Sequence, residues 1–477
     1  MGWDTQETDN MQVGRPRTAI VGGGAAGVLA AIHIARRDPF PREILIFEPA
    51  ERLGAGAAYS TEDPKHLLNV PARCMSAFES EPDDFTSWIA RHCPFTGPED
   101  FAQRRLYRRY LNDCLERSRR SASKGTTIKW VRERVVDIGY SEGGSIRVNV
   151  SHGESRTVND VVLAIGPPPS SALSSFGLKS SRQIVSDPWT PGALSEISPD
   201  DEVLVIGTGL TMVDVCLVLG TSPGRRIHAV SRNGWTPAAH EANGFSPWPN
   251  VDFDGALTAS EVLRRFRAAV SDAESSGGGW RNVVSAARSK IPAVWGELPD
   301  AEKQRLLRHV SRRWDVHRHR MCPQVSRSIG SMIAGGRLSV EAGRVVDIVP
   351  VVSNRRVRFE AVIMVRGIEK RIEVATVVDC TGPGTTRPSS VIGRMYASGI
   401  ARPHPTGLGM DVDEDGCIRG ADGFSHPGIH TIGWARRGSA FESTAIPELR
   451  VQASQLSERI ARRETSARSS ALALVAS

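Results

Sequence analysis

The chain has 477 residues, a length typical of two to four domain-sized units with room for a large core. Hydrophobic residues make up 40% and charged residues 24%, and no uncharged apolar run approaches the ~20 residues that a membrane span needs, so we expect no membrane partner. The net charge of +7 comes from arginines scattered through half-apolar segments, which favours phosphorylated cofactors and anionic small molecules over nucleic acid.

Residues 1–17 are polar and partly acidic and lack the apolar middle of a signal peptide, so a cytoplasmic location is expected. The seven cysteines show no CxxC spacing. This spacing argues against a disulfide framework, a zinc ribbon and a dithiol redox site, and we expect no metal.

Residues 18–48 have the pattern strand, glycine turn, helix, strand. Gly22 permits the tight turn, Gly24 lets the backbone approach a pyrophosphate, and Gly27 lets the helix pack closely on the strand. Glu48 ends the second strand, where a carboxylate accepts hydrogen bonds from ribose hydroxyls. The segment predicts a dinucleotide site, for either NAD or FAD.

Arg52 opens a segment with further close-approach glycines, residues 52–59, which we expect to extend the cofactor site. Asn69 stands in an apolar run before a proline, where its amide would bond the flavin edge or, alternatively, its own backbone in a turn. Three further segments are expected to be strands of a meander: residues 130–136, 145–150 and 157–165.

The strand, turn, helix and strand pattern recurs over residues 203–232 and predicts a second nucleotide domain. Gly207 and Gly209 occupy the first two glycine positions, but Met212 replaces the third. A degenerate domain that no longer binds a nucleotide is therefore the alternative.

Ser231 and Arg232 follow the second strand of this unit, where an NAD site would place an acid. A hydroxyl and a guanidinium suit a 2′-phosphate, so the pair favours NADPH over NADH.

Residues 245–335 show helical periodicity and predict a mostly helical insertion over the substrate site. Arg318 and Arg320 are candidates for an anionic substrate or an NADPH phosphate, the alternative being a solvated basic helix with Trp314 packed inward. His240 is a candidate for contact with the nicotinamide or flavin, or else an ordinary loop histidine.

Residues 428–434 have the pattern of a strand that ends at Gly433. Ser443 or Thr444 would cap a following helix, whose N-terminus near Ala445 would point at the isoalloxazine. Such a late return of the chain is how two-domain flavoproteins reach the flavin, and it favours FAD at the first site.

Residues 337–378 are expected to be strand-rich again. Residues 411–416 match the start of a calcium loop, but prolines before them argue against the helix that such a loop needs, so a turn between strands is expected. Residues 464–477 are rich in serine and alanine and are expected to form a loose tail.

The fold class predicted from these elements is α/β, with two Rossmann-like dinucleotide-binding domains, for FAD and NADPH, and a mostly helical insertion. The expected division is as follows: residues 1–184 form the first part of the FAD domain, 185–383 the NADPH domain, 384–463 the second part of the FAD domain, and 464–477 the tail.

Several of these motifs resemble a bacterial family of FAD/NAD(P)-binding proteins that is similar in layout to flavin-dependent N-hydroxylating monooxygenases. The matching segments are residues 22–27, 67–72, 187–189, 207–214, 231–234 and 442–450. The resemblance implies oxidation of the amino group of a small amine or amino acid, aspartate included.

The two cofactors restrict the reaction, because NADPH passes a hydride to the flavin and the flavin must pass its electrons on. With molecular oxygen, a reduced flavin can form a C4a-hydroperoxide that oxygenates an amine, a scheme that requires no particular catalytic side chain. The alternatives are a reductase or dehydrogenase with another electron acceptor, and a flavin-bound sensor with little turnover.

Overall fold

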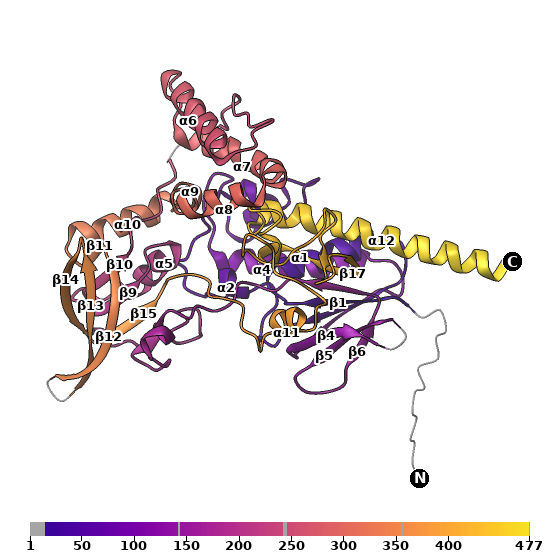
Figure 1. Cartoon of the computed structure of the whole chain (residues 1–477), viewed down its shortest axis with the longest axis horizontal. Helices are drawn as coiled ribbons and strands as arrows, with labels where there is room; N and C mark the ends of the chain where they lie inside the picture. Colours follow the sequence, from indigo (N-terminus) through magenta and orange to yellow (C-terminus); the bar gives the residue numbers. More distant parts are fainter. Residues whose placement is uncertain (1–14, 142–143, 242–245, 354–355, 477) are drawn as a thin grey trace, which may run out of the picture.

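A computed structural model describes residues 15–476 apart from 142–143, 242–245 and 354–355. Residues 1–14 of the N-terminal segment, and residue 245, where the helical insertion is expected to begin, lie outside the described residues. Figure 1 shows two lobes side by side, a first lobe around β1 and α12 and a second lobe around β9 and β12, with the helices α6 and α7 above them.

The first lobe is built on a six-stranded sheet in the order β16-β17-β7-β1-β2-β3, parallel except for the edge strand β16. Its strands are Arg17–Val21, Glu43–Phe47, Thr127–Val131, Asp160–Leu163, Cys417–Arg419 and Ser425–Thr431, which are β1, β2, β3, β7, β16 and β17. Apolar strands such as β2 are buried along their whole length because both faces of a parallel sheet are covered.

Helices cover one face of this sheet and a small sheet covers the other. The helices are α1 (Ala25–Arg37), α4 (Arg104–Ser121) and α12 (Ile446–Ala476), with α3 (Asp84–His92) packed beside α4. The small antiparallel sheet consists of β4 (Val135–Tyr140), β5 (Ile146–Val150) and β6 (Arg156–Val158), and α11 (Val391–Ala397) packs on β4.

The small sheet corresponds to the expected meander. The prediction was wrong for β3 and β7, which it joined to strands of this small sheet. Residues 130–136 span the end of β3 and the start of β4, and residues 157–165 span β6 and β7. The strands β3 and β7 belong to the parallel sheet instead. The boundaries are the short polar stretches at 132–134 and at Asn159, which contain no glycine or proline, so the sequence carries no strong breaker at the change of sheet.

The second lobe has an all-parallel sheet in the order β11-β10-β9-β15-β8. The strands β8, β9, β10, β11 and β15 are Ile184–Val185, Val203–Ile206, Ile227–Ser231, Leu338–Ala342 and Thr376–Asp379. One face packs on α5 (Leu210–Leu219) and α10 (Pro323–Ala334). The other packs on an antiparallel sheet of β12 (Arg344–Ser353), β13 (Arg356–Val365) and β14 (Ile368–Val374).

The segment expected to be helical contains α6 (Ala259–Ser275), α7 (Trp280–Glu297), α8 (Asp300–His309) and α9 (Ser311–Arg318) before α10. Helices α6 to α9 pack on one another, whereas α10 packs on α5 and β11 and so belongs to the second lobe. The Trp295 indole joins the insertion to the first lobe, because it donates to Gly438 O at 2.7 Å and stacks on Phe441.

Residues 464–476 differ from the expected loose tail, because they continue α12, which projects beyond the first lobe in Figure 1. Their alanines and serines are compatible with a helix, and Glu464 pairs with Arg468 one turn later at 2.6 Å. Glu464 also lies 3.7 Å from the buried guanidinium of Arg42, which fixes this part of the helix on the lobe.

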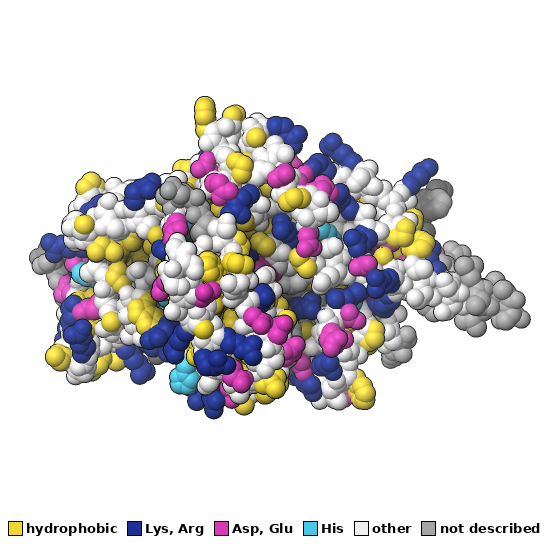
Figure 2. Space-filling model, turned by 90° about the horizontal axis from the view of Figure 1, so that it is seen from above, with side chains coloured by type: hydrophobic (Ala, Val, Ile, Leu, Met, Phe, Trp, Pro, Cys, Tyr) yellow, Lys and Arg dark blue, Asp and Glu magenta, His cyan; other side chains and the backbone are white. Residues whose placement is uncertain are grey.

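Positive and negative side chains are interspersed over the face that Figure 2 shows. This distribution agrees with the scatter of arginines along the sequence. Among the described residues, no helix is long and apolar enough to cross a membrane.

Candidate functional site

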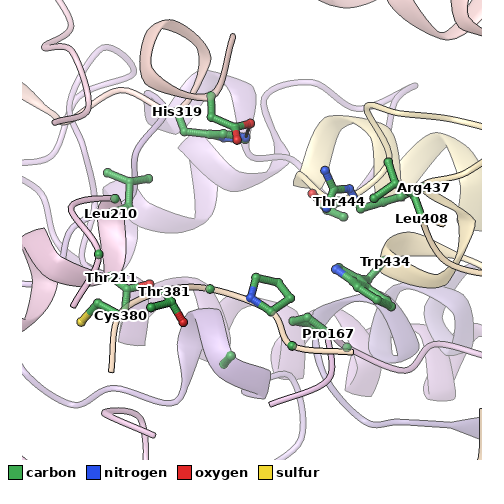
Figure 3. A pocket seen from close by; sticks show the side chains of 18 of the residues that line it. Pro167, Leu210, Thr211, His319, Cys380, Thr381, Leu408, Trp434, Arg437 and Thr444 are labelled. Carbon is green, nitrogen blue, oxygen red and sulfur yellow. Dashed lines mark ion pairs between the residues drawn. The ribbon is translucent and has the colours of Figure 1, made fainter. Parts of the chain in front are cut away.

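One cavity of about 1790 Å³ lies between the two lobes, under the helical insertion. Both glycine turns line it, the first through Gly22 and Gly24 and the second through Gly207 and Gly209. Figure 3 shows how side chains from different elements border its open space: Leu210, Thr211, Cys380, Trp434, Arg437 and Thr444, with His319 above them. The cavity has the size and position to bring two nucleotides together.

The first turn needs its glycines for identifiable reasons. Gly22 has φ +105°, and a Cβ there would lie 2.7 Å from Ala164 O. A Cβ on Gly27 would collide with Gly22 O. A Cβ on Gly24 would meet only Gly56, at 3.6 Å, and would otherwise enter the cavity, where a pyrophosphate would approach the backbone at the start of α1.

Glu48 lies at the end of β2 and lines the same part of the cavity. Its carboxylate accepts hydrogen bonds from Gly23 N and Ala50 N, both at 2.9 Å, and is thereby held beside the glycine turn. This is the position in which a carboxylate receives ribose hydroxyls.

The chain returns to this turn at Gly433, as the sequence predicts. Gly433 has φ +74°, lines the cavity, and donates its N–H to Gln452 Oε1 of α12 at 2.9 Å. The indole Nε1 of the neighbouring Trp434 is buried without a hydrogen-bond acceptor among the described residues. Trp434 borders the open space in Figure 3.

The start of α12 differs in detail from the expected capping. Ser443 does not cap the helix, because its hydroxyl donates to Gly433 O at 2.9 Å. Ala445 supplies the first carbonyl acceptor of the helix, for Glu448 N and Leu449 N. Ala445 itself does not line the cavity, whereas Thr444 beside it does.

The second turn repeats the geometry of the first. Gly207 has φ +105°, and a Cβ there would collide with the backbone of Cys380. No atom lies within 4 Å of a Cβ built on Gly209, which leaves the backbone open toward the cavity. Met212, at the third position, is fully buried in the core between α5 and the sheet.

Ser231 and Arg232 line the cavity at the end of β10. The Ser231 hydroxyl lies 2.7 Å from the Thr208 hydroxyl, which links the end of β10 to the second glycine turn. Arg232 is exposed, and no carboxylate of the described residues pairs with it. The two residues therefore lie together where the sequence predicts a 2′-phosphate site.

Two other expected cofactor residues are not on the cavity wall. Arg52 lines a separate, smaller pocket and forms an ion pair with Glu62. The backbone carbonyl oxygen of Asn69 is the partner of His240 Nε2, at 2.9 Å. His240 does not line the cavity either, and burial lowers its pKa to about 4.

The two candidate substrate arginines also lie behind the wall. Arg318 is 5% exposed and pairs with Glu442 at 3.2 Å, and burial lowers its pKa. Arg320 donates to Ser285 Oγ at 3.2 Å, and burial lowers its pKa to about 10. Trp314 packs inward, as the alternative expects, and donates to Glu442 at 2.7 Å, and Arg312 and Arg313 are exposed, but both candidate arginines are buried.

Several charged or titratable residues on the cavity wall were not predicted, among them Asp315, His319 and Arg437. Burial raises the pKa of Asp315. His319 Nε2 lies 3.9 Å from Asp315 Oδ1, yet its desolvated position among arginines lowers its pKa to about 3. The i,i+4 spacing of Asp315 and His319 was a usable signal that both face the same way.

The expected turn at residues 411–416 is present, because Asp413 O accepts a hydrogen bond from Gly416 N at 3.0 Å. Asp411 pairs with Arg402 at 2.6 Å. Asp411 and Asp413 therefore stabilise the turn that leads into β16.

Part of the first lobe matches a known protein family. Residues 19–168 match the model of a family described as FAD-NAD(P)-binding. These residues contain the first glycine turn, Glu48 and the strands β1, β2, β3 and β7. No curated protein sequence matches the chain.

Several solved structures are similar over almost the whole chain. The ornithine N-hydroxylase of Kutzneria sp. 744, with reduced FAD, NADP⁺ and L-ornithine, is 17% identical, with a TM-score of 0.63, covering 94% of this chain and 99% of its own. The L-lysine 6-monooxygenase of Pseudomonas syringae gives the same values. The FAD-bound cadaverine monooxygenase DfoA of Erwinia amylovora is 14% identical, with a TM-score of 0.64 and 94% of each chain covered.

These likenesses confirm the predicted fold class, α/β with two Rossmann-like units and an inserted helical segment. They also confirm the resemblance to N-hydroxylating flavin monooxygenases at the level of the fold.

Proposed function

We propose that the protein is an FAD- and NADPH-dependent monooxygenase that oxygenates the nitrogen of a small amine or amino acid. The observation that carries the proposal is the shared cavity, because both glycine turns open onto it. A hydride donor in the second lobe and a flavin in the first would meet there without leaving the protein.

The first lobe would hold FAD through Gly22, Gly24 and Gly27, with Glu48 on the ribose and Gly433 near the flavin. The FAD-NAD(P)-binding family match over residues 19–168 supports this assignment. The N-terminus of α12 opens toward the cavity through Thr444 and Ile446, and its positive end would favour negative charge on a reduced ring. When bound, reduced FAD would supply the oxygen-activating chemistry.

The second lobe would hold NADPH through Gly207 and Gly209, with Ser231 and Arg232 toward the 2′-phosphate. In domain terms, residues 1–184 and 384–463 would form the FAD unit and residues 185–383 the NADPH unit. This division follows the sheets, except that β8, which begins at Ile184, already pairs with β15 of the second sheet.

The substrate would lie under α9, where the cavity carries both signs of charge. Asp315, which Arg312 faces at 3.7 Å, offers a carboxylate to an ammonium group, and Arg437 offers a guanidinium to a carboxylate. This arrangement fits a zwitterionic amino acid, and aspartate is included among the candidates. Arg318, Arg320 and His240 would act behind the wall, by holding the elements that form it.

The test is oxygen uptake and NADPH consumption by the purified protein with L-aspartate, L-ornithine, L-lysine and cadaverine. We expect one of these amines to raise both rates and to yield a hydroxylamine, nitroso or nitro product. NADPH oxidation that never yields an oxygenated amine would indicate a reductase, and an absence of steady NADPH oxidation would indicate a sensor.

A further inference from the structure

The ends of β10 and β11 form one edge of the second lobe. The two strands are parallel neighbours, with Ser231 opposite Ala342. Gly343 N donates to Ser231 O at 2.9 Å, and a Cβ on Gly234 would lie 2.9 Å from Ala342 N. The turn that carries Arg232 is therefore packed against the turn that leads into Arg344.

Arg232 and Arg344 are both exposed, and both line the cavity. No carboxylate of the described residues pairs with either guanidinium. The nearest acid along β11, Glu341, is paired with Lys370 at 2.8 Å. An uncompensated positive charge thus lies where the second nucleotide site would place the adenosine ribose.

We propose that Arg344 and Arg232 together form a clamp for the 2′-phosphate of NADPH, so that Arg344 is a second determinant of nucleotide choice. The inference rests on the proposed binding of NADPH in the second lobe. A phosphate monoester carries a charge of about −1.5 to −2 near neutral pH and offers three acceptor oxygens, enough for two planar guanidinium groups. A ribose hydroxyl offers neither.

Arg344 could instead stack on the adenine ring, which has the same structure in NADH and NADPH. The two roles differ in a measurable way. A clamp acts only on ligands that carry the 2′-phosphate, whereas stacking contributes equally to ligands with and without it.

The test uses the full chain and two adenosine probes, 2′,5′-ADP and 5′-AMP, with binding measured by isothermal titration calorimetry. R344Q should weaken the binding of 2′,5′-ADP about tenfold or more, because charge-assisted hydrogen bonds to the 2′-phosphate are lost. The affinity for 5′-AMP should change by less than about twofold. R232Q should do the same, and the double variant should bind the two probes about equally.

R327Q is the matched control, because Arg327 is an exposed arginine of α10 in the same lobe but away from the cavity. It removes the same charge and should leave both affinities within about twofold. In flavin reduction measured without oxygen, R344Q should lower the NADPH-over-NADH preference by a similar factor.

Equal weakening of both probes by R344Q would establish stacking and overturn the clamp, and so would an R344Q variant that binds both probes like the wild type. A wild-type protein that binds the two probes equally would also overturn it. The oxygenase proposal fails separately, when 2′,5′-ADP binds preferentially but NADPH oxidation never yields an oxygenated amine.

Discussion

Glu442 is the residue through which the insertion is anchored beside the cavity, and its charge can be removed with little change of shape. Its carboxylate is 8% exposed, pairs with Arg318 at 3.2 Å and accepts the Trp314 indole at 2.7 Å. Arg318 Nε finds no hydrogen-bond acceptor among the described residues, and Glu442 is the carboxylate that pairs with this buried cation. E442Q should keep the contact with Trp314 and remove the carboxylate that pairs with Arg318.

Breaking a buried ion pair by removing one partner costs about 3–5 kcal/mol, whereas an exposed pair is worth about 0–1 kcal/mol. We therefore expect E442Q to lower the free energy of unfolding, measured in urea, by about 3 kcal/mol. The double variant R318M/E442Q should recover part of this loss, because it removes the stranded charge as well. E360Q, which breaks the exposed Arg371–Glu360 pair, is the control and should cost less than about 1 kcal/mol.

The reasoning about the anchor is refuted if E442Q costs no more than E360Q. It is also refuted if the effects of E442Q and R318M simply add, because independent effects would mean that the two charges do not compensate each other.

Two further predictions separate folding from cofactor binding and give the effect of pH. G24V should keep the wild-type free energy of unfolding but purify without flavin, because its side chain points into the cavity. G22A should lower the free energy of unfolding, because Gly22 has φ +105°. A G24V protein with full flavin content would disprove this placement of FAD. His430 is 4% exposed, and burial lowers its pKa from 6.5 to about 4, so its contribution is complete above pH 6.5 and is lost as pH falls toward 4, a change of about 3 kcal/mol. H430Q should therefore flatten the decline of unfolding free energy between pH 6.5 and 4, whereas substitution of the exposed His152 should leave the decline unchanged.

The glycine turns were predictable because their requirements are local. Gly22, Gly27 and Gly207 are needed for backbone angles or close packing within a strand–turn–helix unit, and the sequence carries that unit complete at the first site and without its third glycine at the second. Glu48 and Arg232 followed from their places at the ends of strands. These features depend on residues fewer than about thirty positions apart.

The features that were missed depend on partners far along the chain. Arg318 looked like a free cation because its partner Glu442 lies 124 positions later. The tail was predicted to be loose because the partners that hold it lie far away in the sequence. Glu464 lies near Arg42, and the adjacent Arg463 pairs with Asp160 at 2.5 Å. A charge pattern read along one segment contains no information on such partners.

The relative position of the two nucleotide sites depends on the two connections between the lobes. The chain leaves the first sheet after β7 and returns to it at β16 and β17, so the second lobe is an insertion between strands of the first sheet. The outgoing and returning segments are bonded to each other, by Gly384 N to Pro168 O at 3.2 Å and by Ser170 Oγ to Asp379 Oδ2 at 2.7 Å. Both segments also line the cavity. Because the paired connections form part of the wall between the two glycine turns, a change in their packing would alter the distance between hydride donor and flavin without touching either binding turn.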